Sequence, residues 1–110
     1  LTAPLMKWMF GKYVSDPAQR GNDLMSPVRA SAERLRGLPA TLIVVAENDI
    51  LRDEGEAMGR RLDEAGVEVT TVRFNGVVHD WGMLNGFAAL HPTRTLIRLV
   101  GSVLRDYLEK

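Results

Sequence analysis

The feature that most constrains this chain is an uninterrupted apolar run that ends in polar and acidic residues. Leu42 to Ala46 contains only aliphatic side chains, with no polar alternation. That pattern is typical of a parallel strand that is covered on both faces. Asn48 and Asp49 follow at the carboxyl end of the run, where open α/β sheets carry their functional groups. The stretch 41–47 is therefore predicted to be a buried parallel strand with a polar tip.

A helix is predicted directly after this tip. Asp53 and Glu56 have the spacing of a capping box, in which Asp53 caps the helix and Glu56 answers it. Apolar residues then recur on one helical stripe, and Gly66 is suited to end the helix. We therefore expect a helix near 54–65.

The segment that follows predicts a second strand. In 67–74, valine and phenylalanine alternate in part with polar residues, as in a strand that exposes one face near a sheet edge. Because a helix separates the two strands, the unit 41–74 is βαβ, with parallel strands and a right-handed crossover. Asn75 and Gly76 are a turn signal, and a second polar strand end follows at His79. The predicted fold class is α/β.

Two further helices are predicted to flank this unit, near 4–14 and 92–109, because apolar side chains recur there at helical spacing. The first is rich in methionine and aromatic residues. We expect it to face the core, with Met6, Trp8 or Met9 lining a substrate pocket as the alternative, and the two roles are compatible.

Composition excludes several classes of function. Fourteen basic and fourteen acidic side chains cancel, so no net charge steers the chain toward nucleic acid or an anionic membrane. There is no cysteine for a disulfide, a thiolate metal site or a nucleophile, which is compatible with the cytoplasmic location that we expect. No apolar run approaches the roughly 20 residues of a transmembrane helix. We expect no cofactor.

Two titratable residues follow the two predicted strands. Asp49 comes after the first strand and His79 after the second, and neighbouring parallel strands lie about 4.8 Å apart. A carboxylate that accepts from one imidazole nitrogen fixes the tautomer and leaves the other nitrogen free to take a proton. The structural alternatives are a loop histidine whose hydrogen bonds are satisfied, for His79, and a turn carboxylate, for Asp49. The placement of both residues after successive parallel strands favours a pair instead. His91 has no such partner and is expected at the surface, and no second histidine stands at metal-ligand spacing.

Longer motifs surround this pair. Asp49-Ile-Leu-Arg-Asp-Glu-Gly55 is followed by a helix, a Gly-Val-Glu-Val strand and Gly76-Val-Val-His79-Asp-Trp-Gly-Met83. In this combination the chain resembles the carboxyl-terminal part of an α/β-hydrolase, and within that fold the hormone-sensitive-lipase-like esterases. Segments 5–13 and 26–30 are similar to those that precede the acid strand in the family.

The resemblance implies specific roles. Asp49 is then the acid of a catalytic triad and His79 its general base. Trp81 stands where it would border the mouth of the active site, and Trp81 and Met83 are candidate substrate-binding residues. Ile50 replaces the proline that commonly follows the acid, which leaves the carboxylate in place. The implied activity of the parent protein is hydrolysis of short- or medium-chain carboxylic esters.

The serine of such a triad is not found in this sequence. The family carries it in a Gly-x-Ser-x-Gly elbow, with an upstream His-Gly-Gly element for the oxyanion, and neither motif occurs in these 110 residues. The order of the triad in this fold is serine, acid, histidine, so we expect the nucleophile before residue 1. Residues 1–110 are then the carboxyl-terminal portion of the domain, inactive alone. Two strands make a marginal sheet, so we expect a homo-oligomer or an element-swapped dimer.

Two alternatives remain open from the residues. An acid–histidine half does not fix the substrate, so the parent could be another α/β-hydrolase, such as a peptidase or a lactone hydrolase. The chain could also be a non-catalytic domain that associates through its exposed sheet edge.

Overall fold

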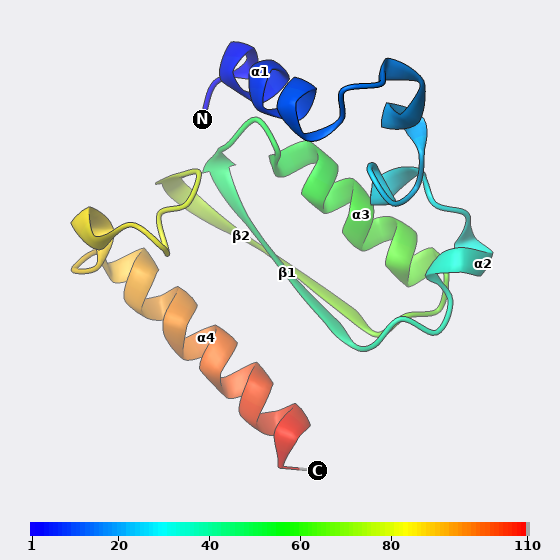
Figure 1. Cartoon of the computed structure of the whole chain (residues 1–110). Helices are drawn as coiled ribbons and strands as arrows, with labels where there is room; N and C mark the ends of the chain where they lie inside the picture. Colours follow the sequence, from blue (N-terminus) through cyan, green and yellow to red (C-terminus); the bar gives the residue numbers. More distant parts are fainter. Residues whose placement is uncertain (110) are drawn as a thin grey trace.

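A two-stranded parallel sheet lies between helices on its two faces in the computed structural model, which describes residues 1–109 (Figure 1). The elements, in order along the chain, are α1 (Ala3–Tyr13), η1 (Pro17–Gly21), η2 (Pro27–Arg29), α2 (Ala32–Leu35), β1 (Thr41–Asn48), α3 (Arg52–Glu64), β2 (Val69–Val78), η3 (Asn85–Phe87) and α4 (His91–Leu108), where η marks a 3₁₀-helix.

The predicted βαβ unit is confirmed. β1 and β2 pair in parallel, α3 connects them, and the three long helices lie within two residues of the predicted bounds. The short helix α2 begins after Ser31, whose side chain accepts from the amide of Arg34 at 3.3 Å.

The second strand differs from the prediction at both ends. It begins at Val69 rather than residue 67 and continues to Val78 through Asn75 and Gly76, so these two residues do not form a turn between elements. Ala46 is level with Phe74, but Asn48 is level with Val78, which leaves two extra residues in β2. Gly76 has a φ of 73°, a left-handed conformation that costs glycine little. Asn75 and Gly76 therefore lie in a β-bulge within β2.

The predicted capping box is wrong. The N-cap position of α3 is Leu51, which makes no side-chain cap. Asp53 pairs instead with the neighbouring Arg52 at 2.8 Å, and Glu56 pairs across to Arg73 on β2. The helix begins earlier than expected because Asp49 accepts a hydrogen bond from the amide of Leu51 at 2.9 Å, which starts the turn within the strand tip.

Helix α3 closes one face of the sheet tightly. A buried cluster joins α3 to α2, to the segment before α2 and to the loop before β2. The cluster consists of Ala30, Leu35, Leu62, Ala65 and Val67. Gly55 allows the close approach, because a Cβ atom at this position would lie only 2.7 Å from Cγ1 of Val45.

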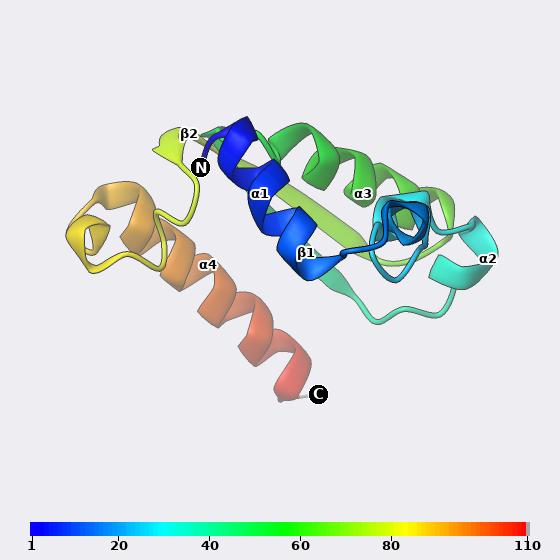
Figure 2. The same ribbon diagram turned by 45° about the horizontal axis from the view of Figure 1, so that its top comes forward.

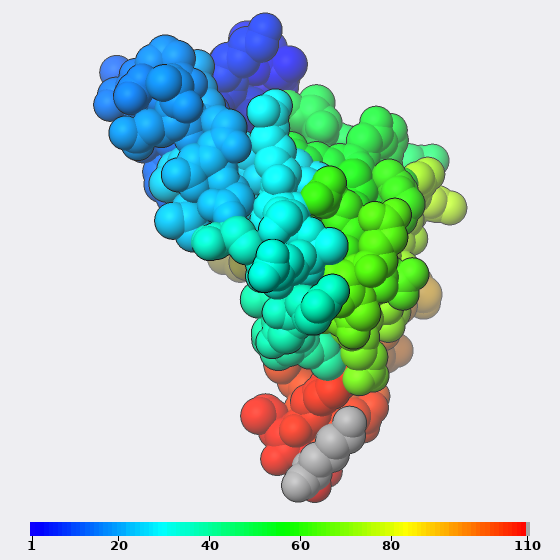
Figure 3. Space-filling model, turned by 90° about the vertical axis from the view of Figure 1, so that its right-hand side faces the viewer, coloured from blue at the N-terminus to red at the C-terminus, as the bar shows by residue number. Residues whose placement is uncertain are grey.

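Helix α4 covers the opposite face more loosely. Figures 1 and 2 show α4 on the other side of the sheet from α3, running antiparallel to the strands. It is held near its start by Leu96, which packs against the cluster of Ala46, Val77 and Trp81. Near its end Tyr107 donates to Glu68 at 2.6 Å. Viewed from the α3 side, the C-terminal end of α4 projects below the rest of the molecule (Figure 3).

Helix α1 does not face a core within residues 1–109, contrary to the expectation. None of its residues is buried, and Trp8 and Tyr13 are 62% and 73% exposed. Met6 and Phe10 are half-buried and lie on the side of a hollow shared with α3. The apolar stripe is therefore real, but the described part of the chain supplies only part of a covering surface for it.

Candidate active site

The two residues that follow the strands meet at one end of the sheet. Nδ1 of His79 lies 2.7 Å from Oδ2 of Asp49. An ionised carboxylate only accepts hydrogen bonds, so Nδ1 carries the proton and donates it. The side chains are 30% and 11% exposed, respectively, so the histidine reaches solvent while the acid is largely covered. The pairing predicted from the sequence is present in the structure.

Asp49 is held on both of its oxygens. While Oδ2 accepts from His79, Oδ1 accepts from the backbone amide of Leu51 at 2.9 Å. Burial acts to raise the pKa of Asp49, but the hydrogen bonds from Leu51 and His79 and the charge of the imidazolium outweigh it, so this pKa is lowered. The carboxyl is therefore ionised at neutral pH, in the form that orients an imidazole.

The bulge in β2 brings the two residues level. At Thr41 and Val69 the paired residues are 28 positions apart (69 − 41), whereas at Asn48 and Val78 they are 30 apart (78 − 48). His79 is also 30 positions after Asp49. An insertion of two residues preserves the alternation of side chains along a strand, so His79 points to the face on which Asp49 lies.

A second carboxylate stands on the other side of the imidazole. Oδ2 of Asp80 lies 3.4 Å from Nε2 of His79, and the Asp80 side chain is half exposed. Asp80 has a φ of 59°, and it is the one non-glycine residue with positive φ among residues 1–109. Asp80 thus lies in a tight turn directly after His79, and the sequence alone did not predict this turn.

An apolar cleft of about 580 Å³ opens beside the pair, between the sheet and α4. Trp81 lines the cleft and is buried, with 6% exposure. The centroid of its ring lies 5.4 Å from that of the Phe74 ring. Met83 also lines the cleft and is 84% exposed. Both candidate substrate-binding residues thus border the cleft, one as part of its wall and one at its rim. Its apolar wall is completed by Val44, Ala46, Leu96, Val100 and Leu104.

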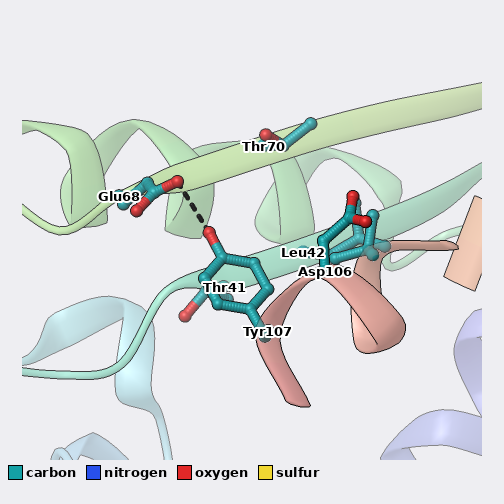
Figure 4. A pocket seen from close by; sticks show the side chains of 7 residues that line it. Thr41, Leu42, Glu68, Thr70, Asp106 and Tyr107 are labelled. Carbon is teal, nitrogen blue, oxygen red and sulfur yellow. Dashed lines mark hydrogen bonds between the residues drawn. The ribbon is translucent and has the colours of Figure 1, made fainter. Parts of the chain in front are cut away.

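Two other hollows lie away from the His79 ring. One of about 1,040 Å³ separates α1 from α3 and includes Met6, while Trp8 and Met9 do not line it. The other, of about 300 Å³, lies at the start of the strands, where Tyr107 reaches Glu68 (Figure 4). His91, expected at the surface, is exposed.

Two other kinds of site are absent from residues 1–109. Among residues 1–109, no group of three or more histidine, aspartate or glutamate side chains is placed to hold a metal ion. In the same part of the chain, no helix combines the length and the apolar character needed to cross a bilayer.

Comparison with known proteins assigns this chain to a family. A family model described as alpha/beta hydrolase fold matches residues 1–83, which contain both Asp49 and His79. This chain belongs to the alpha/beta hydrolase family. It is 37% identical over 94 residues to an arylesterase of Saccharolobus solfataricus, a match that covers 86% of this chain and 28% of the arylesterase.

Solved structures of esterases share the fold. A thermostable esterase from Pseudomonas putida ECU1011 is 46% identical and superposes with a TM-score of 0.90, over 92% of this chain and 32% of that esterase. Brefeldin A esterase, a bacterial homologue of human hormone-sensitive lipase, is 34% identical with a TM-score of 0.75, over 83% of this chain and 26% of that esterase. The resemblance to this group of hydrolases is confirmed, and the chain spans about a third or less of the length of these relatives.

Proposed function

We propose that this chain supplies the acid and the base of a serine carboxylesterase. In this proposal Asp49 orients His79, and His79 takes the proton of a serine that comes from outside residues 1–110. The substrate is a short- or medium-chain carboxylic ester. The observation that carries the proposal is the 2.7 Å hydrogen bond between His79 and Asp49 beside an apolar cleft.

The electrostatics of the pair support a general base. When the imidazole takes a proton at Nε2, it becomes an imidazolium whose charge is stabilised by the carboxylate on Nδ1. Asp49 serves this purpose because its pKa is lowered and it stays ionised. A histidine held in one tautomer by such a partner transfers protons with little reorganisation.

The serines of this chain do not supply the nucleophile in this proposal. Ser26 donates its hydroxyl proton to the carbonyl of Arg20 at 2.7 Å, and Ser31 caps α2. None stands in a Gly-x-Ser-x-Gly elbow. Acyl transfer needs a nucleophile and oxyanion donors as well as an acid and a base. Residues 1–110 are thus proposed to be the carboxyl-terminal portion of the catalytic domain, without activity of their own.

The apolar surface supports association of the chain with itself. Ile97 and Leu104, which line the cleft, are 61% and 54% exposed, and Leu108 near the end of α4 is 81% exposed. Leu42 and Val44 on β1 are only half-buried, although their pattern is that of a covered strand. Such surfaces drive association, so the isolated chain is proposed to form dimers or larger oligomers.

Complementation tests the catalytic proposal. The chain is expressed together with the part of the P. putida esterase that precedes the region matched by this chain, and hydrolysis of p-nitrophenyl acetate is measured. We expect activity in the mixture and none in the chain alone. His79→Ala should reduce the activity of the mixture by about a thousandfold or more, because removing a triad member leaves only residual catalysis.

His91→Ala is the matched control, because His91 is exposed and lies outside the cleft. It should leave the activity of the mixture unchanged. Equal activity in the His79→Ala and His91→Ala mixtures would refute the role of His79. Hydrolysis by the chain alone that is lost in His79→Ala would refute the need for an external serine.

A further inference from the structure

We infer that Glu47 is a positioning residue for His79, acting through the bulge of β2. Its carboxylate atom Oε2 accepts a hydrogen bond from the backbone amide of Gly76 at 2.7 Å. Gly76 is one of the extra residues that separate the two registers of the sheet. The proposal deepens the proposed function, because it names the residue that keeps the base level with the acid.

The bulge determines whether the catalytic pair can form. If the pairing before the bulge continued, Asp49 would be level with residue 77, and His79 would lie two residues further along. At a rise of about 3.3 Å per residue, that displacement is about 6 to 7 Å. A 2.7 Å hydrogen bond between Nδ1 and Asp49 could not survive such a shift. The two extra residues are therefore a condition for the pair.

Glu47 is the side chain placed to hold the bulge open. It is the β1 residue between the last partner before the register shift, Ala46, and the first after it, Asn48. A bulge leaves backbone groups of the longer strand without ladder partners. The Gly76 amide is one of these, and Glu47 supplies its acceptor. The backbone carbonyl of Glu47 in turn accepts from the guanidinium of Arg52 at the start of α3.

This arrangement links three segments through one residue. The side chain of Glu47 binds the bulge that carries His79, and its backbone is bound by the helix that follows Asp49. Loss of the carboxylate frees the bulge to relax toward the shorter register. His79 would then move away from Asp49 without unfolding of α3, whose buried cluster lies at the other end of the sheet around Ala30 and Val67.

Two variants of similar size separate the acceptor from the packing. Glu47→Gln keeps an oxygen that can accept from the Gly76 amide, whereas Glu47→Met keeps the length of the side chain and has no such acceptor. Glu56→Met is the matched control, because it removes another carboxylate that contacts β2, at Arg73, outside the bulge. All three are made in the chain as it stands and checked by far-ultraviolet circular dichroism.

The readout is the proton on Nδ1 of His79, observed by NMR in chain labelled with ¹⁵N-histidine. A charge-assisted hydrogen bond to a carboxylate shifts this proton far downfield and slows its exchange with water. We expect Glu47→Met to speed the exchange of the Nδ1 proton by about tenfold or more. This is the effect expected when that proton loses its hydrogen bond to the charged carboxylate of Asp49. Glu47→Gln and Glu56→Met should keep the signal, with exchange within about threefold of the unsubstituted chain.

Unchanged exchange in Glu47→Met would overturn the proposal. So would loss of the signal in Glu47→Gln to the same extent as in Glu47→Met, or loss of helical signal in Glu47→Met, since Glu47 would then support the whole sheet rather than one residue. The NMR measurement needs no catalysis. A failed complementation assay therefore refutes the esterase role, and an unchanged Nδ1 proton refutes the role of Glu47.

Discussion

The close approach of α3 to the sheet predicts that Gly55→Ala destabilises the chain. The new Cβ atom would lie 2.7 Å from Cγ1 of Val45, about 1 Å inside the optimal separation of two carbon atoms. Val45 is buried at 8% exposure and is β-branched, so it has little freedom to turn away. Overpacking of this kind costs about 1 to 3 kcal/mol.

A matched substitution removes the effect of helix propensity from this comparison. Alanine is favoured over glycine inside a helix by about 1 kcal/mol, and this gain offsets part of the steric cost in Gly55→Ala. Gly101 lies within α4, and a Cβ atom there would meet nothing within 4 Å. Gly101→Ala should therefore be stabilising by about 0.5 to 1 kcal/mol. The difference between the two variants then isolates the steric cost, about 1 to 3 kcal/mol.

Urea unfolding followed by circular dichroism measures this difference. Each variant is compared at two protein concentrations, because association stabilises the folded state by mass action, and the m-values must agree. Adding Val45→Ala to Gly55→Ala removes the atom that is contacted, so the double variant should recover about 1 to 3 kcal/mol relative to additivity. A Gly55→Ala chain as stable as Gly101→Ala would refute the close approach of helix and strand.

Two predictions concern pH. The pKa of Asp49 is lowered in the folded state, so its contribution to stability is present above the ordinary range of aspartate, about 4, and is lost as the pH falls below it. Asp49→Asn should flatten the acid-unfolding profile, whereas Asn in place of the exposed Asp63 should not, and equal profiles in all three chains would contradict this. Donation to Glu68 raises the pKa of Tyr107, so its absorbance titration should lie above about 10 and disappear in Tyr107→Phe. A Tyr107 step that lies at the same pH in Glu68→Ala as in the unsubstituted chain would show that the hydrogen bond to Glu68 has no such effect.

Local patterns were sufficient to predict most of the fold. The apolar run from Leu42 to Ala46 has no polar alternation, which is typical of a parallel strand that is covered on both faces. The helix and the second strand followed from the same rules, as did the meeting of Asp49 and His79. Each of these depends on residues close in sequence, or on the general fact that parallel strands end at the same edge of a sheet.

The start of α3 and the end of β2 were not predictable in this way. Asp53 has the residue type and the spacing of a helix cap. However, Asp49 accepts a hydrogen bond from the Leu51 amide, and the helix begins at Arg52, so Asp53 already lies inside it. Asn75 and Gly76 fit both a turn and a bulge. Local spacing does not distinguish the two: in the bulge the Gly76 amide donates to Glu47, which lies 29 positions earlier and contacts it only in the folded chain.

The two faces of the sheet are covered to different degrees, and the Asp49–His79 pair lies beside the less covered face. On the α3 face, buried side chains and a glycine contact leave the helix little room to move. On the α4 face, the helix is fixed at its two ends, by Thr93 and Leu96 near Trp81 and by Tyr107 at Glu68, and the cleft lies between. Few packed contacts hold the middle of α4, and such regions open at low free energy. The middle of α4 is therefore expected to open more readily than α3, which is packed closely against the face of the sheet opposite the cleft.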